Sequence, residues 1–373
     1  MGRDLSVDRK RNLTLVVTHQ CNFDCRYCLQ KHEDVYMPRE TAVKAIDMLV
    51  DGLSKIKESP RAQISFYGGE PLLARNEIEY LVTYAREKFS KIKDLKYGFE
   101  ITTNGLLLDQ EFIDFAKKNH ILLALSYDGV AQDEVRIKRG GNPTREIVDK
   151  KLDMLLKTFP ETIIMMTIHP DYASTISESV KYFHAKGVRA VSLVPAHGNR
   201  VTWNDDSFAI LSSELEKVKN LYIRWNEGDN YFRFIPFENK IRNYIREKDA
   251  DNAMCHFGCH KLMVDADGKY YPCNHFIGMD GYSIGSVTEG TDEKKIASLE
   301  SKRVEAKDCE GCVLRPRCRH TCACANHGHT GDMSQVSALQ CEYEQLTIRL
   351  ADEAAAVLLA GENPTFIRRM YKE

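Results

Sequence analysis

The chain has 373 residues, enough for one large domain and a smaller one, because a single hydrophobic core stops growing near about 250–300 residues. Its 52 Lys and Arg nearly balance its 54 Asp and Glu, so the net charge of −2 provides no bulk attraction to nucleic acid or to an anionic membrane. No run reaches the roughly 20 apolar residues of a membrane span, and residues 1–12 lack the apolar stretch of a signal peptide, so we expect a cytoplasmic protein.

Strand patterns alternate with helical patterns from Asn12 to about Pro195, which predicts repeated β/α units and a parallel sheet. The predicted strands are Leu13–Thr18, Gln63–Tyr67, Gly98–Thr102, Leu122–Ser126, Ile163–Ile168 and Ala190–Val194. The predicted helices between them are Glu40–Leu53, Glu77–Phe89, Gln110–Lys118, Arg145–Thr158 and Ile176–Lys186. Six such strands indicate an α/β fold, a partial (β/α)6 TIM barrel with its site at the carboxyl ends of the strands.

The alternation fades beyond Val201, where helical patterns occupy Asp206–Glu227 and Phe237–Glu247. Residues Lys261–Tyr271 predict a β-hairpin, and Leu339–Leu359 has the apolar spacing of a closing helix. We therefore expect a barrel over residues 1–200, a connecting helical segment over 201–254, and a small cysteine-rich domain over 255–373.

The twelve cysteines indicate bound metal, since a chain without an export signal is kept reduced and disulfides explain its cysteines poorly. Cys21, Cys25 and Cys28 follow the first predicted strand. Thiolates suit iron–sulfur clusters, and three ligands leave one iron of a four-iron cluster open to chelate a small molecule. A zinc site completed by His19 or His32 is the alternative.

This motif resembles that of the radical S-adenosylmethionine (SAM) superfamily, over roughly Leu13 to Val194. The resemblance implies a [4Fe–4S] cluster at the three cysteines that reduces SAM to a 5′-deoxyadenosyl radical. It also implies SAM contacts, with Tyr27 near the adenine and the Gly68, Gly69, Glu70 and Pro71 segment at the amino group. The further contacts it implies, to the ribose, the methionyl portion or the carboxylate, are Thr103, Asn104, Ser126 and Arg136.

A second cysteine pattern occupies the last third of the chain. It contains Cys309, Cys312, Cys318, Cys322 and Cys341, preceded by Cys255, Cys259 and Cys273. The pattern resembles the SPASM domain, which holds two auxiliary clusters. That resemblance assigns Cys255, Cys259, Cys273 and Cys322 to one cluster and Cys309, Cys312, Cys318 and Cys341 to the other, leaving Cys324 over. Zinc knuckles are the alternative, with His256, His260, His320 and His327 available.

Two related reactions compete for the assignment. Anaerobic sulfatase-maturating enzymes, which the chain resembles in length and in both motifs, oxidise Cys or Ser to formylglycine with an Asp base directly after the cysteine corresponding to Cys273. This chain has Asn274 there, and an amide cannot act as a base. Other base candidates are Asp265, Asp267, His275 and Glu238.

The sequence therefore favours the second class, SPASM maturases that install a thioether or carbon–carbon crosslink in a ribosomally made peptide. The expected partners are a peptide or protein substrate and a reductant such as flavodoxin or ferredoxin. Because the first motif begins at Cys21, we expect no leader-binding domain before it. A non-catalytic electron carrier with three clusters is a further alternative, which would not need the segment Gly68–Pro71.

Overall fold

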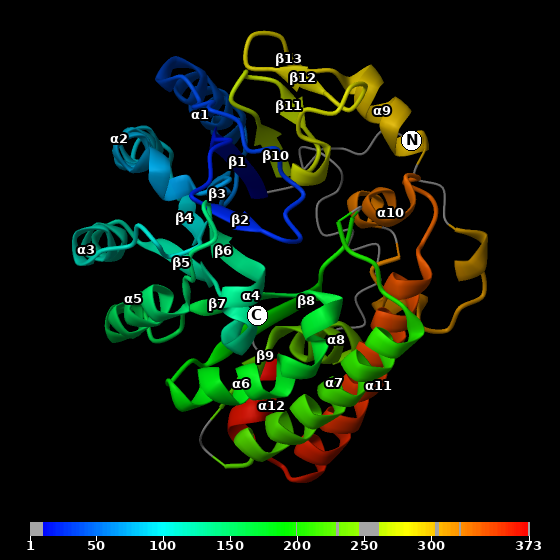
Figure 1. Ribbon diagram of the computed structural model, residues 1–373. Coiled ribbons are helices and arrows are strands. Elements are labelled where there is room, and N and C mark those ends of the chain that lie inside the picture. Colours follow the sequence, from blue (N-terminus) through cyan, green and yellow to red (C-terminus); the bar gives the residue numbers. More distant parts are fainter. Residues whose placement is uncertain are drawn as a thin grey trace. The chain divides into compact units, whose positions relative to one another are not determined.

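The computed structural model describes residues 10–198, 200–228, 231–245, 261–302, 306–320 and 322–371 (Figure 1). The described residues fall into two compact units. The first unit contains residues 10–22, 30–124 and 261–302, and the second contains residues 23–29, 125–245 and 306–371 with the gaps just given. Both units draw on segments that lie far apart in the sequence.

A parallel sheet forms the centre of the α/β fold and confirms the predicted fold class. The six predicted strands are present as β1 (Lys10–Thr18), β3 (Arg61–Gly68), β4 (Lys96–Thr103), β5 (Ile121–Ser126), β7 (Ile163–Ile168) and β8 (Ala190–Pro195). The nine-stranded order is β11-β10-β1-β3-β4-β5-β7-β8-β9, where the added strands are β9 (Arg233–Phe234), β10 (Lys261–Val264) and β11 (Tyr270–Tyr271). The predicted hairpin therefore extends the sheet, because β10 pairs parallel with β1 and places Leu262 beside Leu13.

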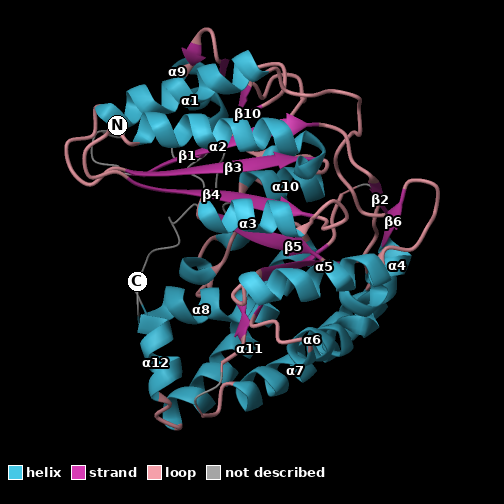
Figure 2. Cartoon of the chain, turned by 90° about the vertical axis from the view of Figure 1, so that its left-hand side faces the viewer, coloured by secondary structure: helices cyan, strands magenta, loops and turns pink. Residues whose placement is uncertain are grey.

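In the first unit, α1 (Arg39–Ser54), α2 (Arg75–Phe89) and α3 (Gln110–Lys118) lie across the strands (Figure 2). This unit also contains α9 (Glu293–Ser301). Helix α1 buries Ala42, Ala45, Ile46 and Leu53, the spacing of an amphipathic helix, and it contacts β1 and α2. The short strands β12 (Gly285–Ser286) and β13 (Gly290–Thr291) pair with each other.

The second unit is rich in helices, and α11 packs along α7 and α8 (Figure 1). Its helices are α4 (Gln132–Val135), α5 (Arg145–Thr158), α6 (Ile176–Ala185), α7 (Asp205–Trp225), α8 (Ile235–Ile245), α10 (Ala323–Thr330), α11 (Ala338–Ala360) and α12 (Pro364–Tyr371). Asn204 begins α7 with a capping box, in which its side chain and that of Ser207 bond each other's backbone N–H groups. Among the described helices, none combines the length and the apolar character needed to cross a membrane.

Candidate active site

The loop that follows β1 is held against the end of β3 by two glycines of the first unit. The Gly69 and Glu70 amides donate to the carbonyl oxygens of Thr18 and Gln20, at 3.1 and 2.9 Å. A Cβ atom on Gly68 would lie 2.2 Å from the Thr18 carbonyl oxygen, and one on Gly69 would lie 2.3 Å from that of Gln20. Only glycine permits this approach, so the Gly-Gly pair fixes the backbone that leads into Cys21.

Glu70 joins the same loop to the end of β4 through a buried carboxylate. Its Oε1 accepts from Thr103 Oγ1 at 2.7 Å and from the Leu72 amide at 3.0 Å, and its Oε2 accepts from the Asn104 amide at 2.7 Å. A carboxylate has about four acceptor positions, so one stays available to a further donor. Burial raises the pKa of Glu70, and the three hydrogen bonds oppose that rise by stabilising the ionised form.

Asn104 extends this network to the first cysteine. Its Nδ2 donates to Asn22 Oδ1 at 2.7 Å and lies 3.8 Å from the Cys21 sulfur. A hydrogen-bond donor near the sulfur stabilises the thiolate, and the thiolate is the form in which a cysteine ligates iron. Thr103 and Asn104 thus hold Glu70 and Cys21 in the described structure.

The second unit holds the rest of the cysteine motif beside a buried ion pair. Strand β2 (Phe23–Cys25) pairs antiparallel with β6 (Arg136–Lys138), so Cys25 lies opposite Arg136. The Arg136 Nε donates to Asp128 at 2.8 Å, and the Tyr27 hydroxyl donates to the same carboxylate oxygen. The guanidinium also lies 5.4 Å from the centre of the Tyr27 ring.

The charges of this group are set by one another, since Asp128 and Arg136 are only 1% and 8% exposed. Burial lowers the pKa of Arg136, but Asp128, Tyr27 and Cys25 together raise it by more, so the guanidinium stays protonated. Burial raises the pKa of the Tyr27 hydroxyl well above its usual range. Asp128 also accepts from the Thr167 amide at 2.8 Å, which ties the group to β7. Ser126 ends β5, two residues before Asp128.

A cavity in the second unit is lined by four cysteine side chains from separate turns and from α11. They are Cys309, Cys312, Cys318 and Cys341, the set that the sequence pattern assigned to one auxiliary cluster. Across the described ranges, no three His, Cys, Asp or Glu side chains are grouped as ligands of a single metal ion. A four-iron cluster is wider than one ion, so its thiolates stand farther apart, and this donor set fits such a cluster.

The wall of this cavity is fixed by a buried ion pair between Lys240 of α8 and Glu344 of α11. Glu344 accepts from the Arg319 amide at 2.7 Å, and Lys240 donates to the Arg317 carbonyl at 2.9 Å. Burial first and the Glu344 carboxylate second raise the pKa of Cys318 to about 12. Its thiolate therefore requires a cationic partner such as iron.

Cys322 and Cys324 form a separate pair at the start of α10. A hydrogen bond from the Cys324 thiol lowers the pKa of Cys322 to about 6, against the opposing effect of burial. Cys322 thus favours the thiolate that ligates iron, whereas buried Cys324 is its donor.

Residues 15–194 match the model of the radical SAM superfamily. The chain belongs to this superfamily. An uncharacterized protein of Methanocaldococcus jannaschii is 31% identical over 247 residues, covering 61% of this chain and 82% of that protein. A cysteine-type anaerobic sulfatase-maturating enzyme of Clostridium perfringens is 22% identical, over 81% of this chain and 85% of that enzyme. A radical SAM cyclopropyl synthase of Paramaledivibacter caminithermalis is 22% identical, over 90% of this chain and 73% of that synthase.

Solved structures share the fold of this radical SAM enzyme. The enzyme anSMEcpe with bound AdoMet and a peptide has a TM-score of 0.75 and 20% identity, over 94% of this chain and 99% of that chain. SuiB of Streptococcus suis, bound to its precursor peptide SuiA, has a TM-score of 0.63 and 17% identity, over 90% of this chain and 77% of that chain. Membership of the superfamily implies that the chain is an enzyme that uses SAM and a [4Fe–4S] cluster.

Asn274 of this radical SAM enzyme is held by two neighbours in the first unit. Its Nδ2 donates to the Tyr67 hydroxyl at 3.0 Å, and its Oδ1 lies 3.0 Å from the Cys273 sulfur. The Tyr67 oxygen also accepts from Gln30 at 2.5 Å. The Asn274 amide is thus a bridge between the end of β3 and Cys273. Tyr67 closes a predicted strand, but no spacing in the sequence pointed to this contact.

The carboxylate base candidates of the radical SAM enzyme all have cationic or histidine partners. Asp265 lies 2.6 Å from His19 Nε2, and this hydrogen bond raises the pKa of His19. Asp267 pairs with Lys269 at 2.8 Å near the tip of the hairpin. Glu238 belongs to the second unit, where guanidinium groups surround it. His275 follows Asn274 directly and packs against Phe276.

The structure thus brings two sets of the predicted radical SAM residues together and leaves others undescribed. Cys21, Gly68, Gly69, Glu70, Thr103 and Asn104 form one network, and Pro71 begins the turn after it. Tyr27 and Arg136 form the other, around Asp128, which follows the fourth predicted strand but to which the resemblance assigned no contact. Cys255, His256, Cys259 and His260 lie outside the described residues. Cys273 belongs to the first unit and Cys322 to the second, and each is described within its own.

Proposed function

We propose that this radical SAM enzyme installs a thioether or carbon–carbon crosslink in a ribosomally made peptide. The observation that carries the proposal is Asn274, an amide that cannot take a proton and whose side chain is engaged with Tyr67 and Cys273. The resemblance to SuiB, solved with a precursor peptide, and to a cyclopropyl synthase supports a peptide substrate.

SAM, when bound at the reduced cluster of Cys21, Cys25 and Cys28, supplies a radical that takes a hydrogen atom from the substrate. The remaining acceptor position of Glu70 suits the amino group of SAM, because the other three fix the carboxylate in place. Arg136 stays protonated and presents donors for a carboxylate. We assign the adenine to Tyr27, and the ribose and methionyl contacts to Thr103, Asn104 and Ser126.

A crosslink also removes a proton and an electron from the substrate. For the electron we propose two auxiliary clusters, because full ligation by cysteine leaves no open iron for substrate. Their ligands are Cys255, Cys259, Cys273 and Cys322 for one, and Cys309, Cys312, Cys318 and Cys341 for the other. The functional division is then a barrel over residues 1–200, a connecting segment over 201–254 and a SPASM domain over 255–373, with flavodoxin or ferredoxin as reductant.

The alternative function is that of an anaerobic sulfatase-maturating enzyme, to which the likeness of the Clostridium perfringens enzyme points. That reaction requires a base in place of Asn274. Asp265, Asp267, Glu238 and His275 are the candidates. Each of the three carboxylates already pairs with a histidine, lysine or arginine side chain.

A sulfatase-derived peptide with the Cys or Ser motif tests the two functions. We expect no formylglycine from the reconstituted enzyme, although SAM is cleaved without coupling to product, because Asn274 cannot accept the substrate proton. Mass spectrometry of the peptide and chromatography of 5′-deoxyadenosine measure both. Asn274→Asp serves as the matched variant and should also form no appreciable product, since the proposed crosslinking enzyme acts on a different peptide. Formylglycine formed at the rate of SAM cleavage would refute the crosslinking assignment.

Cys324 provides a second test, because it donates to a predicted ligand without being one. The variant Cys324→Ser is expected to keep all of its iron, about twelve atoms per chain for three four-iron clusters, and to keep its visible spectrum. Serine retains a hydrogen-bond donor of similar size at the same place. Colorimetric iron analysis of the anaerobically reconstituted variant checks this, and a loss of about four irons would show that the ligand partition is wrong.

A further inference from the structure

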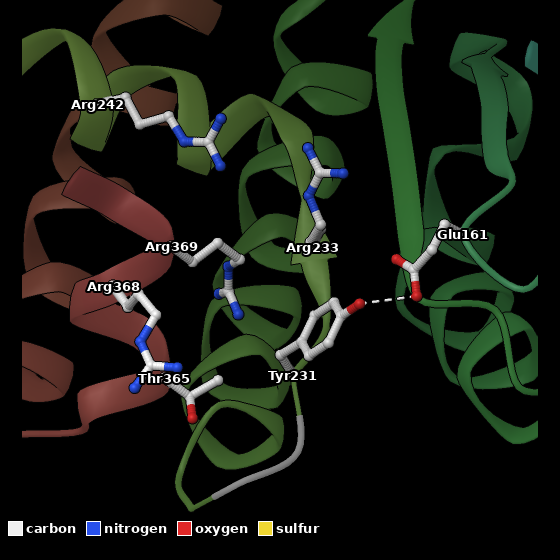
Figure 3. A pocket seen from close by; sticks show the side chains of 7 residues that line it. All are labelled: Glu161, Tyr231, Arg233, Arg242, Thr365, Arg368 and Arg369. Carbon is white, nitrogen blue, oxygen red and sulfur yellow. Dashed lines mark hydrogen bonds between the residues drawn. The ribbon is translucent and has the colours of Figure 1, made fainter. Parts of the chain in front are cut away.

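An open cavity of about 480 Å³ lies within the second unit. Its lining consists of Glu161, Tyr231, Arg233, Arg242, Thr365, Arg368 and Arg369 (Figure 3). The side chains come from the ends of strands and from the helices α8 and α12. Figure 3 shows the α12 residues on one side of the cavity and the bonded pair of Tyr231 and Glu161 on the other.

The cavity is remote from the Tyr27, Asp128 and Arg136 group of the same unit. Glu161 lies two residues before β7 begins, whereas Asp128 bonds the Thr167 amide near the end of that strand. Six residues of strand extend about 20 Å, so the cavity and that group lie at opposite ends of β7. The cavity is therefore not part of the SAM site proposed above.

Positive charge dominates the cavity. Glu238, which is 1% exposed, pairs with Arg233 at 3.2 Å and with Arg369 at 2.9 Å, and Arg242 approaches it at 3.5 Å. Glu161 accepts from Tyr231 and also pairs with Arg189 outside the lining. Two carboxylates thus face four lining guanidinium groups, which leaves an excess of about two positive charges. This excess is similar in magnitude to the negative charge of a phosphate monoester.

Donors without a partner point to a ligand at this place. Arg368 is exposed and has no ion pair or hydrogen bond to any residue that the structure describes. Nη1 of Arg369 is buried and lacks a hydrogen-bond partner within the described ranges. Thr365 adds a hydroxyl to the same lining. Arginine is weakly hydrated, and its planar fork matches two phosphate oxygens at once.

We propose that this cavity, the arginine pocket, binds a small molecule that carries a phosphate monoester. The volume lies within the range of about 300–1,000 Å³ that small-molecule sites occupy. Arg368 holds the phosphate oxygens in a fork, and Thr365 donates a neutral hydrogen bond. Arg369 adds its positive charge while its Nε stays paired with Glu238 and its Nη2 donates to Asn226. The ligand acts at a distance from the chemistry and is neither substrate nor SAM.

Calorimetry on the anaerobically reconstituted enzyme at low salt tests the proposal, with glycerol 3-phosphate as the probe. We expect saturable binding of one molecule per chain, weakened as salt increases because the pocket is open to solvent. Arg368→Glu should weaken this binding at least about tenfold, because a charge-assisted fork is lost and a like charge replaces it. Arg368→Lys keeps the charge without the fork, so its affinity should lie between those of the unaltered enzyme and Arg368→Glu.

Arg139→Glu is the matched control, since it makes the same charge change on an exposed side chain that does not line the arginine pocket. Arg139 directly follows β6. It should leave the affinity for glycerol 3-phosphate unchanged. Inorganic phosphate should compete with the probe, whereas glycerol and citrate should not. The proposal fails if no saturable binding occurs, if Arg368→Glu and Arg139→Glu bind equally well, or if citrate binds more tightly than glycerol 3-phosphate.

Discussion

Replacing Cys21, Cys25 and Cys28 together with alanine is expected to abolish SAM cleavage and to remove about a third of the iron. We assign the three thiolates to the cluster that binds SAM, and alanine supplies no ligand atom in their place. The remaining iron stays, because the proposed auxiliary clusters use eight other cysteines. Iron analysis and chromatography of 5′-deoxyadenosine after chemical reduction measure the two effects.

The fold should survive this change, so the loss of activity reports on the cluster itself. Gly68, Gly69 and Glu70 hold the entry to the loop through backbone atoms, and alanine is smaller than cysteine at each position. Circular dichroism should match that of the unaltered enzyme. Cys324→Ser is the control, a cysteine change expected to spare both iron and activity. SAM cleavage by the triple variant, or tightly bound zinc with little iron in the unaltered enzyme, would contradict the cluster assignment.

The sequence predicted the strands well where apolar runs have clear boundaries. Strand β7 has the predicted bounds Ile163–Ile168, because polar residues and a turn flank an apolar run that only Thr167 interrupts. Strand β1 begins earlier than predicted, at Lys10 rather than Leu13. Its first residues are polar and have no strand pattern of their own, and they extend the strand because they pair with Arg61 and its neighbours. Local pattern thus specified the centre of each strand, and its ends only where polar residues bound the apolar run.

Long-range pairing explains what the sequence did not reveal. Strands β2 and β6 have three residues each, too few for a periodic pattern, yet their pairing sets Cys25 opposite Arg136. Nothing local shows that β10 joins β1 across some 250 residues of chain. The motif around Glu70 predicted a SAM contact, but not that its glycines hold the loop before Cys21, because that approach depends on backbone atoms alone.

The second large effect is expected for Asp128→Ala, which leaves the buried Arg136 guanidinium without its carboxylate. Removing one partner of a buried ion pair typically costs about 3–5 kcal/mol of unfolding free energy, because the charge that remains is desolvated and unpaired. The Tyr27 hydroxyl and the Thr167 amide lose an acceptor at the same time. Glu77→Ala is the matched control, since it breaks the more exposed pair with Arg39 and should cost under about 1 kcal/mol. Denaturant midpoints of the two variants under identical anaerobic conditions measure the difference.

A double variant separates the structural role of this pair from its role toward SAM. Asp128→Leu combined with Arg136→Met replaces both charges with apolar side chains, and such replacements of buried pairs are often neutral or stabilising. The double variant should therefore regain much of the stability that Asp128→Ala loses. It should still bind SAM weakly, because the guanidinium that we assign to the SAM carboxylate is gone. Equal midpoints for Asp128→Ala and Glu77→Ala would show that the pair is not buried as described. Normal SAM affinity in the double variant would remove Arg136 from the proposed SAM contacts while leaving its pairing with Asp128 intact.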